Sequence, residues 1–471
     1  MSETVRVEKL DEVFMRVHCD DGLAKDLHDF FSFTVPGAKF MPSYKNKYWD
    51  GKVRLFSIKT NKIYIGLLPY VDEFCRERGF NFEGIQDVIG EKQRATEELH
   101  QFIEELNLPF SPRDYQMEAF RTAVQYGRQL LLSPTASGKS LIIYLLARYY
   151  NKKTIIIVPT TSLVEQMAKD FIDYGYDEEI CKIYSGQPVF DSAITITTWQ
   201  SFAKAPKEVM QSFDVVVGDE AHLFKAQTLK GILEKMKTTA IRIGTTGTLD
   251  GSECHRLQLE GMFGPVKKVI SSYQLMEEGT IAKINIDCVI LRHTKQKKMT
   301  YQEEMDYLVS NEARNEFICN LVYSLSGNTL ILFQYVEKHG VLLHEKMSKR
   351  LGEDLHYVYG GTDTEDRETV REVVEKSDNS VILASYGTFS TGINIKKIDN
   401  VVFASPSKSR IRNLQSIGRG LRKADGKDSM RLFDIADDLQ CDNFTLRHLK
   451  ERINTYNEEN FPYELKQFDL K

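Results

Sequence analysis

Short runs of consecutive apolar residues recur along most of the chain and alternate with segments of helical periodicity. Continuous apolar runs of this length predict strands buried on both faces, as in parallel sheets covered by helices. In residues 108–280 the runs lie at 130–132, 154–158, 194–197, 214–218 and 241–244. Residues 281–440 repeat the alternation, with runs at 329–333, 380–384, 400–404 and 430–434. The pattern therefore predicts two successive α/β domains with parallel sheets.

Residues 1–90 follow a different pattern and predict a small α+β domain. Residues 13–17 are expected to form a strand, and residues 23–31 place apolar side chains on one face of a helix. A further helix is expected over residues 70–78, where Gly79 ends it.

The remaining segments flank the α/β domains. Residues 91–107 are charged and predict a helical connector to the first of them. Residues 441–471 predict a terminal helix followed by a tail.

Basic and aromatic residues interleave in residues 39–56 of the small domain. Asp50-Gly51 lies between alternating residues and predicts a hairpin turn. The interleaving suits contacts with nucleic acid, in which rings stack on bases and cations meet phosphates. A hairpin whose rings form the small core while its lysines are solvated explains the pattern equally well. The candidate nucleic-acid contacts here are Lys45, Lys47 and Trp49.

The totals describe an ordinary globular protein with ample core. The 471 residues are 42% hydrophobic and 27% charged, and the net charge of -5 means that any nucleic-acid surface must be local. The seven cysteines show no metal-ligand or redox spacing, which favours reduced thiols in the cytoplasm. The longest apolar run is interrupted by Arg148, so no membrane span is expected.

Residues 133–140 connect a predicted strand to a predicted helix and carry a Gly-Lys-Ser sequence. Such a loop binds phosphate, because backbone N–H groups and the helix dipole converge there. Lys139 would reach the β- and γ-phosphates, and the Ser140 hydroxyl would ligate Mg²⁺. Ser133 stands where the general pattern has glycine. Taken alone, the match could be a chance occurrence of Gly-Lys-Ser.

Two further groups of residues fit phosphoryl transfer. Asp219 and Glu220 follow an apolar strand, where one carboxylate can hold Mg²⁺ and the other can orient or deprotonate water. The alternative is a pair that caps the next helix. Arg419 and Arg422 are expected on one face of a helix over residues 409–423, where they could stabilise charge on the γ-phosphate. The alternative there is a solvated basic helix.

The ordered set of motifs over residues 110–435 resembles superfamily-two helicases of the Asp-Glu-x-His type. That resemblance implies two tandem RecA-like motor domains, a small α+β N-terminal domain, and ATP with Mg²⁺. The matching motifs are Arg113-x-x-Gln116, residues 134–140, Pro159-Thr160-Thr161, Asp219-Glu220-Ala221-His222, Thr246-Gly247-Thr248, Thr391-Gly392-Ile393-Asn394 and Gln415-x-x-Gly418-Arg419-x-x-Arg422.

The resemblance also implies a role for each matching residue. Nucleotide contacts would come from Gln116, which reads adenine with support from Arg113, from the loop residues Pro134, Thr135, Ala136, Ser137, Gly138, Lys139 and Ser140, and from Gly392. Asp219 would hold Mg²⁺ with Ser140, and Glu220 would serve the water. His222, Thr246, Thr248 and Gln415 would couple the site to domain motion, while Arg419 and Arg422 act as arginine fingers. Candidate strand contacts are Thr160, Thr198 and Gln200. Ser133 and Ala136 depart from the glycines of many members, which bears on nucleotide affinity.

A narrower resemblance, to the phage UvsW helicases, takes in the N-terminal domain as well. It rests on residues 30–33, 48–51, 146–150 and 384–392. It implies an ATP-dependent DNA helicase that unwinds or branch-migrates forked and junction DNA in phage replication, recombination and repair. The expected partners are branched, single-stranded and duplex DNA, and the expected state is a monomer in the host cytoplasm. The alternatives are an RNA-directed helicase and a duplex translocase that does not separate strands. A non-hydrolysing clamp is disfavoured because Lys139, Glu220 and the arginines are all present.

Overall fold

The structure is a computed structural model that describes residues 4–85, 88, 96–184, 190–388, 395–405, 407, 409–424 and 426–470. The chain divides into two compact units. The first comprises Met1–Ser133 with Gly138–Val269, and the second comprises Pro134–Ser137 with Ile270–Lys471. Within the described residues, no helix is both long and apolar enough to cross a bilayer.

The main sheet of the first unit is entirely parallel, in the order β13-β7-β12-β11-β8-β10-β9 over the described residues. This arrangement confirms the predicted parallel α/β fold. Five strands coincide with the predicted runs, whereas β9 and β13 were not predicted. The strands are β7 (Arg128–Leu132), β8 (Thr154–Val158), β9 (Cys181–Ile183), β10 (Ile194–Thr198), β11 (Val215–Asp219), β12 (Ile241–Thr246) and β13 (Val266–Lys268).

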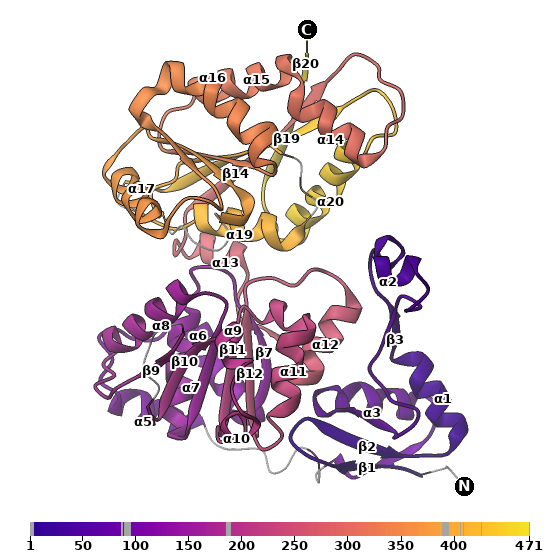
Figure 1. Ribbon diagram of the computed structural model, residues 1–471. Helices are drawn as coiled ribbons and strands as arrows, with labels where there is room; N and C mark the ends of the chain where they lie inside the picture. The colour runs from indigo at the N-terminus through magenta and orange to yellow at the C-terminus, as the bar shows by residue number, and fades with distance from the viewer. Residues whose placement is uncertain are drawn as a thin grey trace. The chain divides into compact units, whose positions relative to one another are not determined.

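Helices cover both faces of this sheet (Figure 1). Successive residues of β8 point to opposite faces, so Ile156 packs among residues of α6, α7 and α8, while Ile155 belongs to the core that contains α11 and α12. Leu99 of α5 is buried in the first of these cores, so the connector packs onto the sheet. The helices are α5 (Thr96–Glu105), α6 (Asp114–Tyr126), α7 (Lys139–Tyr150), α8 (Thr161–Asp173), α9 (Trp199–Phe202), α10 (Lys207–Met210), α11 (Gln227–Lys235) and α12 (Glu253–Phe263).

Over the described residues, the N-terminal domain is a mixed sheet, in the order β5-β2-β1-β6, packed against two helices. Its core is continuous with the α11–α12 face of the parallel sheet. At this junction a Cβ on Gly66 would lie 1.9 Å from the Glu260 carbonyl oxygen, so the two backbones touch. Arg128 Nη2 lies 2.7 Å from Glu12 Oε2, and the Tyr70 hydroxyl donates to Glu260 at 2.6 Å. The elements are β1 (Thr4–Lys9), β2 (Phe14–His18), α1 (Asp21–Phe30), β5 (Lys62–Tyr64), α3 (Leu68–Glu77) and β6 (Asn81–Glu83).

Residues 35–51 form a projection carried by a separate two-stranded ribbon, β3 (Ser32–Thr34) with β4 (Lys52–Arg54) (Figure 1). The predicted hairpin at Asp50-Gly51 is therefore wrong, because β4 pairs with β3 rather than with the residues just before the turn. Those residues instead form a 3-10 turn (Ala38–Phe40) and the short helix α2 (Pro42–Lys45). Pro42 starts α2, since proline lacks an N–H and has its φ preset at the first helical position.

The second unit also contains a parallel sheet, in the order β16-β17-β15-β18-β19-β14-β20 over the described residues. Four of its strands were predicted. The predicted C-terminal tail is wrong, because β20 pairs in parallel with β14 along the sheet edge. The strands are β14 (Lys283–Arg292), β15 (Thr329–Phe333), β16 (Leu355–Val358), β17 (Val381–Ser385), β18 (Asn400–Phe403), β19 (Ser429–Asp438) and β20 (Tyr463–Asp469).

Helices of the second unit pack on both faces of its sheet (Figure 1). One core joins Ile318 and Leu343 to Ile331 and Val402 of the central strands. The helices are α13 (Ser272–Glu277), α14 (Tyr301–Ser310), α15 (Glu312–Tyr323), α16 (Val341–Leu351), α17 (Thr364–Lys376), α19 (Arg410–Gly420) and α20 (Phe444–Glu458).

His339 is fully buried in this unit and is held as a neutral ring. Its Nε2 lies 3.2 Å from Asn315 Oδ1, which accepts, and its Nδ1 lies 3.0 Å from Ser405 Oγ. Burial, with a smaller effect from Arg314, lowers the pKa of His339 to about 3. Between pH 6.5 and pH 3, His339 therefore stays neutral in the folded state, whereas in the unfolded state it binds a proton with the ordinary pKa of 6.5.

Acidification should for this reason destabilise the second unit. Because the folded pKa is depressed, the stabilisation is present above pH 6.5 and is lost as pH falls towards 3. The contribution of His339 to the unfolding free energy should fall by about 2 kcal/mol between pH 7 and pH 5. Urea unfolding followed by pulse proteolysis, which cuts only unfolded segments, would measure it. The variant His339→Gln should lose that part of the pH dependence, and an unchanged dependence would contradict the prediction.

Candidate active site

The phosphate loop joins β7 to α7, at the carboxyl end of a central strand where parallel sheets bind ligands. Gly138 has φ +76°, and a Cβ there would lie 2.3 Å from Gln116 Nε2. Glycine is therefore required twice, for its backbone conformation and for the close approach of Gln116.

The two departures from the family pattern differ in their structural effect. Ala136 has φ +65°, in the left-handed region, where a Cβ costs about 1 kcal/mol and glycine costs nothing. Ser133 is buried, and its N–H donates to the Thr246 carbonyl at 2.8 Å, without a positive φ. The alanine therefore strains the loop, whereas the serine occupies backbone geometry that any residue can adopt.

Lys139 is the first residue of α7, where the helix dipole favours negative charge. Its Nζ lies 3.4 Å from the Ser133 carbonyl oxygen and 4.0 Å from Glu220 Oε1. The ammonium group is thus placed between the loop backbone and an acidic residue of the Asp-Glu-x-His motif, where a phosphate could replace these partners.

The Ser140 hydroxyl lies 2.8 Å from the hydroxyl of Tyr174, the residue that ends α8. The Tyr174 ring packs edge to face against Tyr144 and Phe110, with centroids 5.4 and 5.6 Å away. This contact orients the hydroxyl that is expected to ligate Mg²⁺. Sequence reasoning missed Tyr174, because a partner 34 residues away on another helix leaves no local signal.

Asp219 ends β11 and is 7% exposed. Its Oδ1 accepts a hydrogen bond of 2.8 Å from the Thr245 hydroxyl, a second residue that sequence reasoning missed. Burial raises the pKa of Asp219, and the charge of Glu220 adds to the effect. A bound cation would reverse both, and carboxylate and hydroxyl oxygens are the protein ligands that Mg²⁺ prefers. The donor set of Asp219 and Ser140 therefore fits this ion.

Glu220 is held in a left-handed backbone conformation, with φ +50°. Its Oε2 lies 3.3 Å from Nδ1 of His222, which is itself 2.9 Å from the Thr246 hydroxyl. The Thr246 hydroxyl donates to the Thr248 carbonyl at 3.0 Å, so it accepts from the histidine. A chain of polar contacts thus links the acid expected to serve the water with both threonines expected to couple domain motion.

Gln116 lies beside the loop and is 6% exposed. Its Oε1 accepts a hydrogen bond of 2.9 Å from the N–H of Arg113, the residue before α6. The structure therefore brings Gln116, Lys139, Ser140, Asp219 and Glu220 to one edge of the sheet.

Comparisons with known proteins agree with this geometry. Family models match the N-terminal domain of the DNA helicase UvsW over residues 4–84, the res subunit of type III restriction enzymes over 109–251, and the helicase conserved C-terminal domain over 313–424. The chain is 32% identical to the ATP-dependent DNA helicase uvsW of Enterobacteria phage T4, across 99% of this chain and 100% of that protein. The chain belongs to the UvsW helicase family.

Solved structures of a UvsW helicase match as well. The crystal structure of T4 UvsW has a TM-score of 0.54 at 29% identity and covers 99% of this chain and 100% of its own. A second crystal structure of the UvsW helicase from bacteriophage T4 has a TM-score of 0.53 at 30% identity, with 56% of this chain and 99% of that chain covered. The two parallel sheets are thus the tandem RecA-like domains of a UvsW helicase.

Three candidate site residues of the second unit, Gln415, Arg419 and Arg422, lie on α19 or just after it. Gln415 and Arg419 are half-buried on the helix, but Arg422 follows its end at Gly420. The prediction that both arginines share one helical face is therefore wrong in detail. The Lys427 ammonium group donates hydrogen bonds to the Gly420 and Arg422 carbonyl oxygens. These bonds stabilise the end of the helix before the second arginine. Gly392 lies outside the described residues.

The candidate strand contacts of the first unit differ in their exposure. Thr160 caps α8, and its hydroxyl accepts from Leu163 N at 3.4 Å. Thr198 is 5% exposed and caps α9, with its hydroxyl 3.0 Å from Ser201 Oγ. Gln200 is exposed. Of these three, Gln200 has the side chain most accessible to a strand.

The projection carries the candidate contacts of the N-terminal domain. Lys45 and Lys47 are exposed, but Trp49 is half-buried and donates its indole N–H to the Lys52 carbonyl at 2.8 Å. Phe40 and Tyr48, which sequence reasoning did not select, are 69% and 87% exposed. The alternative in which these rings form the small core does not hold for these two.

Proposed function

We propose that this chain is an ATP-dependent DNA helicase that unwinds or branch-migrates forked and junction DNA in phage replication, recombination and repair. As a member of the UvsW family it is an ATP hydrolase and a DNA motor. The observation that carries the proposal is the hydrolytic set at one sheet edge, where Lys139, Asp219 and Glu220 lie together.

In the proposed reaction, water attacks the γ-phosphorus of ATP and the bond to the ADP oxygen breaks. Lys139 and the loop N–H groups hold the phosphates, and Gln116 receives the adenine. Ser140 and Asp219 would hold a magnesium ion, which supplies positive charge to the phosphates when bound. Glu220 takes the proton of the attacking water, and its carboxylate contacts His222, which in turn contacts Thr246.

The second unit would supply Arg419 and Arg422 to the charge that develops on the γ-phosphate. ATP binding would then favour one arrangement of the two motor domains, and product release the other. If strand contacts on each domain, such as Gln200, differ in affinity between these states, each cycle moves the DNA in one direction. Contacts to the backbone make such binding salt-sensitive and nearly independent of sequence.

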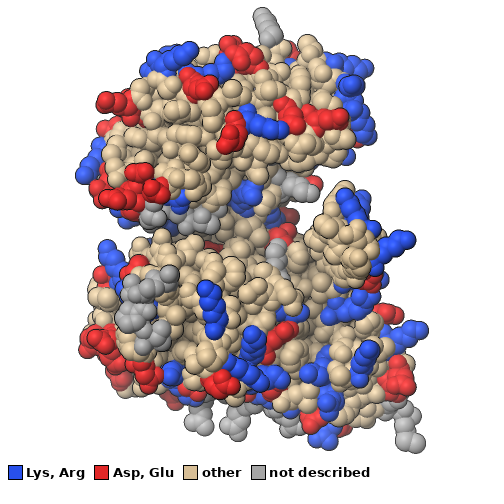
Figure 2. Space-filling view, in the orientation of Figure 1, with Lys and Arg blue, Asp and Glu red and all other residues tan. Residues whose placement is uncertain are grey.

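The projection at residues 35–51 is the part of the N-terminal domain best suited to hold a DNA branch. Residues 35–51 contain three lysines and one acidic residue, Asp50, which pairs with Arg54, and the projection shows basic side chains on its surface (Figure 2). Exposed Phe40 and Tyr48 add rings on which unpaired bases could stack. Cations beside exposed rings suit a junction, where duplex phosphates and unstacked bases lie close together.

Replacing Lys45 and Lys47 by alanine should therefore weaken junction binding by about 10-fold at low salt, because two phosphate contacts are lost. ATP hydrolysis per bound DNA should be nearly unchanged. Titration of a labelled four-way junction by anisotropy would measure the affinity. The control, Lys25→Ala with Lys59→Ala, removes the same charge from exposed positions of the same domain outside the projection. Trp49→Ala should weaken binding indirectly, through loss of the bond to Lys52. Unchanged junction affinity in the Lys45/Lys47 variant would mean that the lysines are merely solvated.

The experiment that tests the function is a panel of fork, four-way junction, gapped and linear DNA, with matched RNA, assayed with ATP and with a non-hydrolysable analogue. The proposal expects ATP-dependent strand separation or branch migration on forks and junctions. Stimulation by RNA alone would favour an RNA-directed helicase. Hydrolysis on duplex without strand separation would favour a duplex translocase. Light scattering of the same samples would test the expected monomer, and the expected site of action is the host cytoplasm.

A further inference from the structure

Helix α19 carries Gln415 and Arg419. The segment before it is held by buried side chains, in addition to backbone hydrogen bonds from Ala404 and Ser405 to the Leu332 carbonyl. We define this leader segment as residues 404–409, of which 406 and 408 lie outside the described residues. It follows β18 and ends at Ser409, whose hydroxyl accepts from Arg412 N at 3.4 Å. Its position sets where the helix begins.

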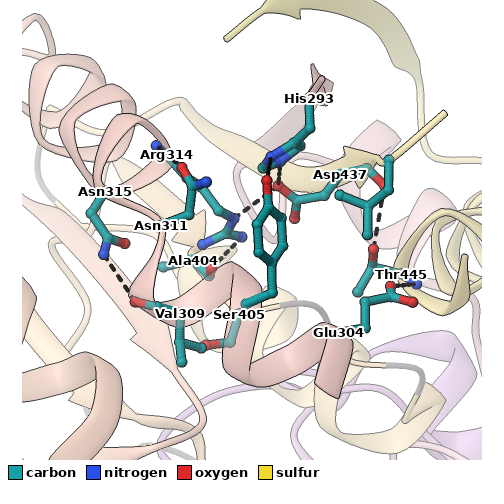
Figure 3. A network of polar contacts seen from close by, with 12 residues as sticks. His293, Glu304, Val309, Asn311, Arg314, Asn315, Ala404, Ser405, Asp437 and Thr445 are labelled. Carbon is teal, nitrogen blue, oxygen red and sulfur yellow. Dashed lines mark hydrogen bonds and ion pairs between the residues drawn. The ribbon is translucent and has the colours of Figure 1, made fainter. Parts of the chain in front are cut away.

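The first anchor is a buried ion pair beside the leader segment (Figure 3). Arg314 of α15 and Asp437 of β19 are both fully buried, and Arg314 Nε donates to Asp437 Oδ1 at 2.8 Å. The same guanidinium group donates to the Ala404 carbonyl at 2.8 Å through Nη2. Burial alone would raise the pKa of Asp437, but Arg314 and a hydrogen bond from His293 hold it below its usual range. The carboxylate is therefore charged and keeps the arginine in place.

The second anchor repeats this arrangement from the C-terminal helix. Arg452 of α20 pairs with Asp434 of β19, with Nε 2.8 Å from Oδ2, and both side chains are almost completely buried. Its Nη1 donates to the Ser407 carbonyl at 3.0 Å. Between the two anchors, the buried Tyr386 hydroxyl donates to the Ser405 carbonyl at 3.1 Å. Each described carbonyl from 404 to 407 is thus held by a side chain from a different element.

The other end of α19 is held by Lys427, which is 4% exposed. Its ammonium group donates to the carbonyls of Gly420, Arg422 and Lys396, with distances of 3.1 Å to the last two. Burial lowers the pKa of Lys427 to about 8. A cation at this point also interacts favourably with the C-terminal end of the helix dipole.

Such an arrangement is not what stability alone favours. Removing a charge from water is costly, and well-packed apolar residues often stabilise as much as a buried ion pair does. Here the buried cations converge on main-chain carbonyls at both ends of one helix. We propose that Arg314, Tyr386, Arg452 and Lys427 are positioning residues that fix α19, and through it Arg419 and Arg422, for ATP hydrolysis. The inference rests on the proposed function, since it assumes that these arginines act on the γ-phosphate.

Two buried tyrosines provide a matched test. Tyr386 and Tyr456 are both almost completely buried, and each donates one hydrogen bond, Tyr386 to the leader segment and Tyr456 to Asp434 Oδ2 at 2.8 Å. Tyr386→Phe should lower kcat of DNA-stimulated hydrolysis about 5-fold, while KM for ATP and the affinity for a fluorescent ADP stay within about 2-fold. Tyr456→Phe removes one hydrogen bond to Asp434 but leaves both contacts of Arg452 with that carboxylate, Nε to Oδ2 and Nη2 to Oδ1. It should lose similar thermal stability and keep kcat within about 2-fold. Equal kcat losses that track stability would overturn the inference.

Lys427→Met extends the test to the other end of the helix. Measured well below its melting temperature, this variant should lose about 10-fold or more in kcat at unchanged ADP affinity. The control Lys423→Met changes an exposed lysine of the same turn and should have no effect. If Arg419→Ala and Arg422→Ala leave hydrolysis unchanged, the proposed function fails. If they abolish it while Tyr386→Phe and Lys427→Met do not lower kcat, only the positioning role fails.

Discussion

Replacing Lys139 by alanine should reduce DNA-stimulated ATP hydrolysis by about 10³-fold, while DNA binding without nucleotide stays within about 2-fold. The ammonium group lies between the loop backbone and Glu220, and no other basic side chain of the described hydrolytic set is placed to replace it. The methyl group of alanine fits the first turn of α7, so the fold should persist.

Steady-state hydrolysis with saturating junction DNA, together with junction affinity by anisotropy, would measure both quantities. The control Lys152→Ala removes an exposed lysine just after the same helix and should keep full activity. Undiminished hydrolysis in Lys139→Ala would refute the assignment of the site.

Replacing Arg419 and Arg422 together by alanine should lower kcat by about 10³-fold or more and leave the affinity for fluorescent ADP within a few-fold. In the role proposed for them, these guanidinium groups act on charge that develops on the γ-phosphate during hydrolysis, and ADP lacks that phosphate. The double variant should therefore keep its affinity for ADP and lose turnover, whereas Lys139→Ala should weaken both ADP binding and turnover.

Single-turnover hydrolysis with excess enzyme would show whether the chemical step is slowed. The single variants test whether Arg422, which lies beyond the end of α19, matters as much as Arg419 on the helix. Arg350→Ala, at an exposed position of α16, is the charge-matched control. A normal single-turnover rate in the double variant would exclude the arginines from the chemistry.

The sequence predicted the central strands of both sheets because buried parallel strands are continuously apolar. Strands β8 and β15, for instance, are buried at every residue. It missed the edge strand β20, where most residues are exposed and the apolar run is broken by Lys466. In the projection, Asp50-Gly51 predicted a hairpin, but a local signal of this kind does not identify the strand that pairs with β4, which is β3.

The candidate site shows the same division. Motif residues could be predicted because phosphate chemistry requires particular side chains at fixed spacing along the chain. Their supporting partners could not, since Tyr174 and Thr245 meet Ser140 and Asp219 only through the packing of separate elements. Arg452 likewise lies in the predicted terminal helix, and its contact with Asp434 depends on how α20 packs against β19.

The contact between Gly66 and the Glu260 backbone has a mechanical consequence. If the small domain were joined only by a flexible linker, DNA bound to it could move relative to the phosphate loop during each ATP cycle. Here the small domain and the sheet that carries the phosphate loop share one hydrophobic core, so the small domain and Lys139 belong to one compact unit. If the projection binds DNA as proposed, this shared core would make the DNA contact and the phosphate loop move together through each ATP cycle. Lengthening the connector between the two domains would leave this shared core intact. A bulky side chain at residue 66 would instead separate the small domain from the Glu260 backbone.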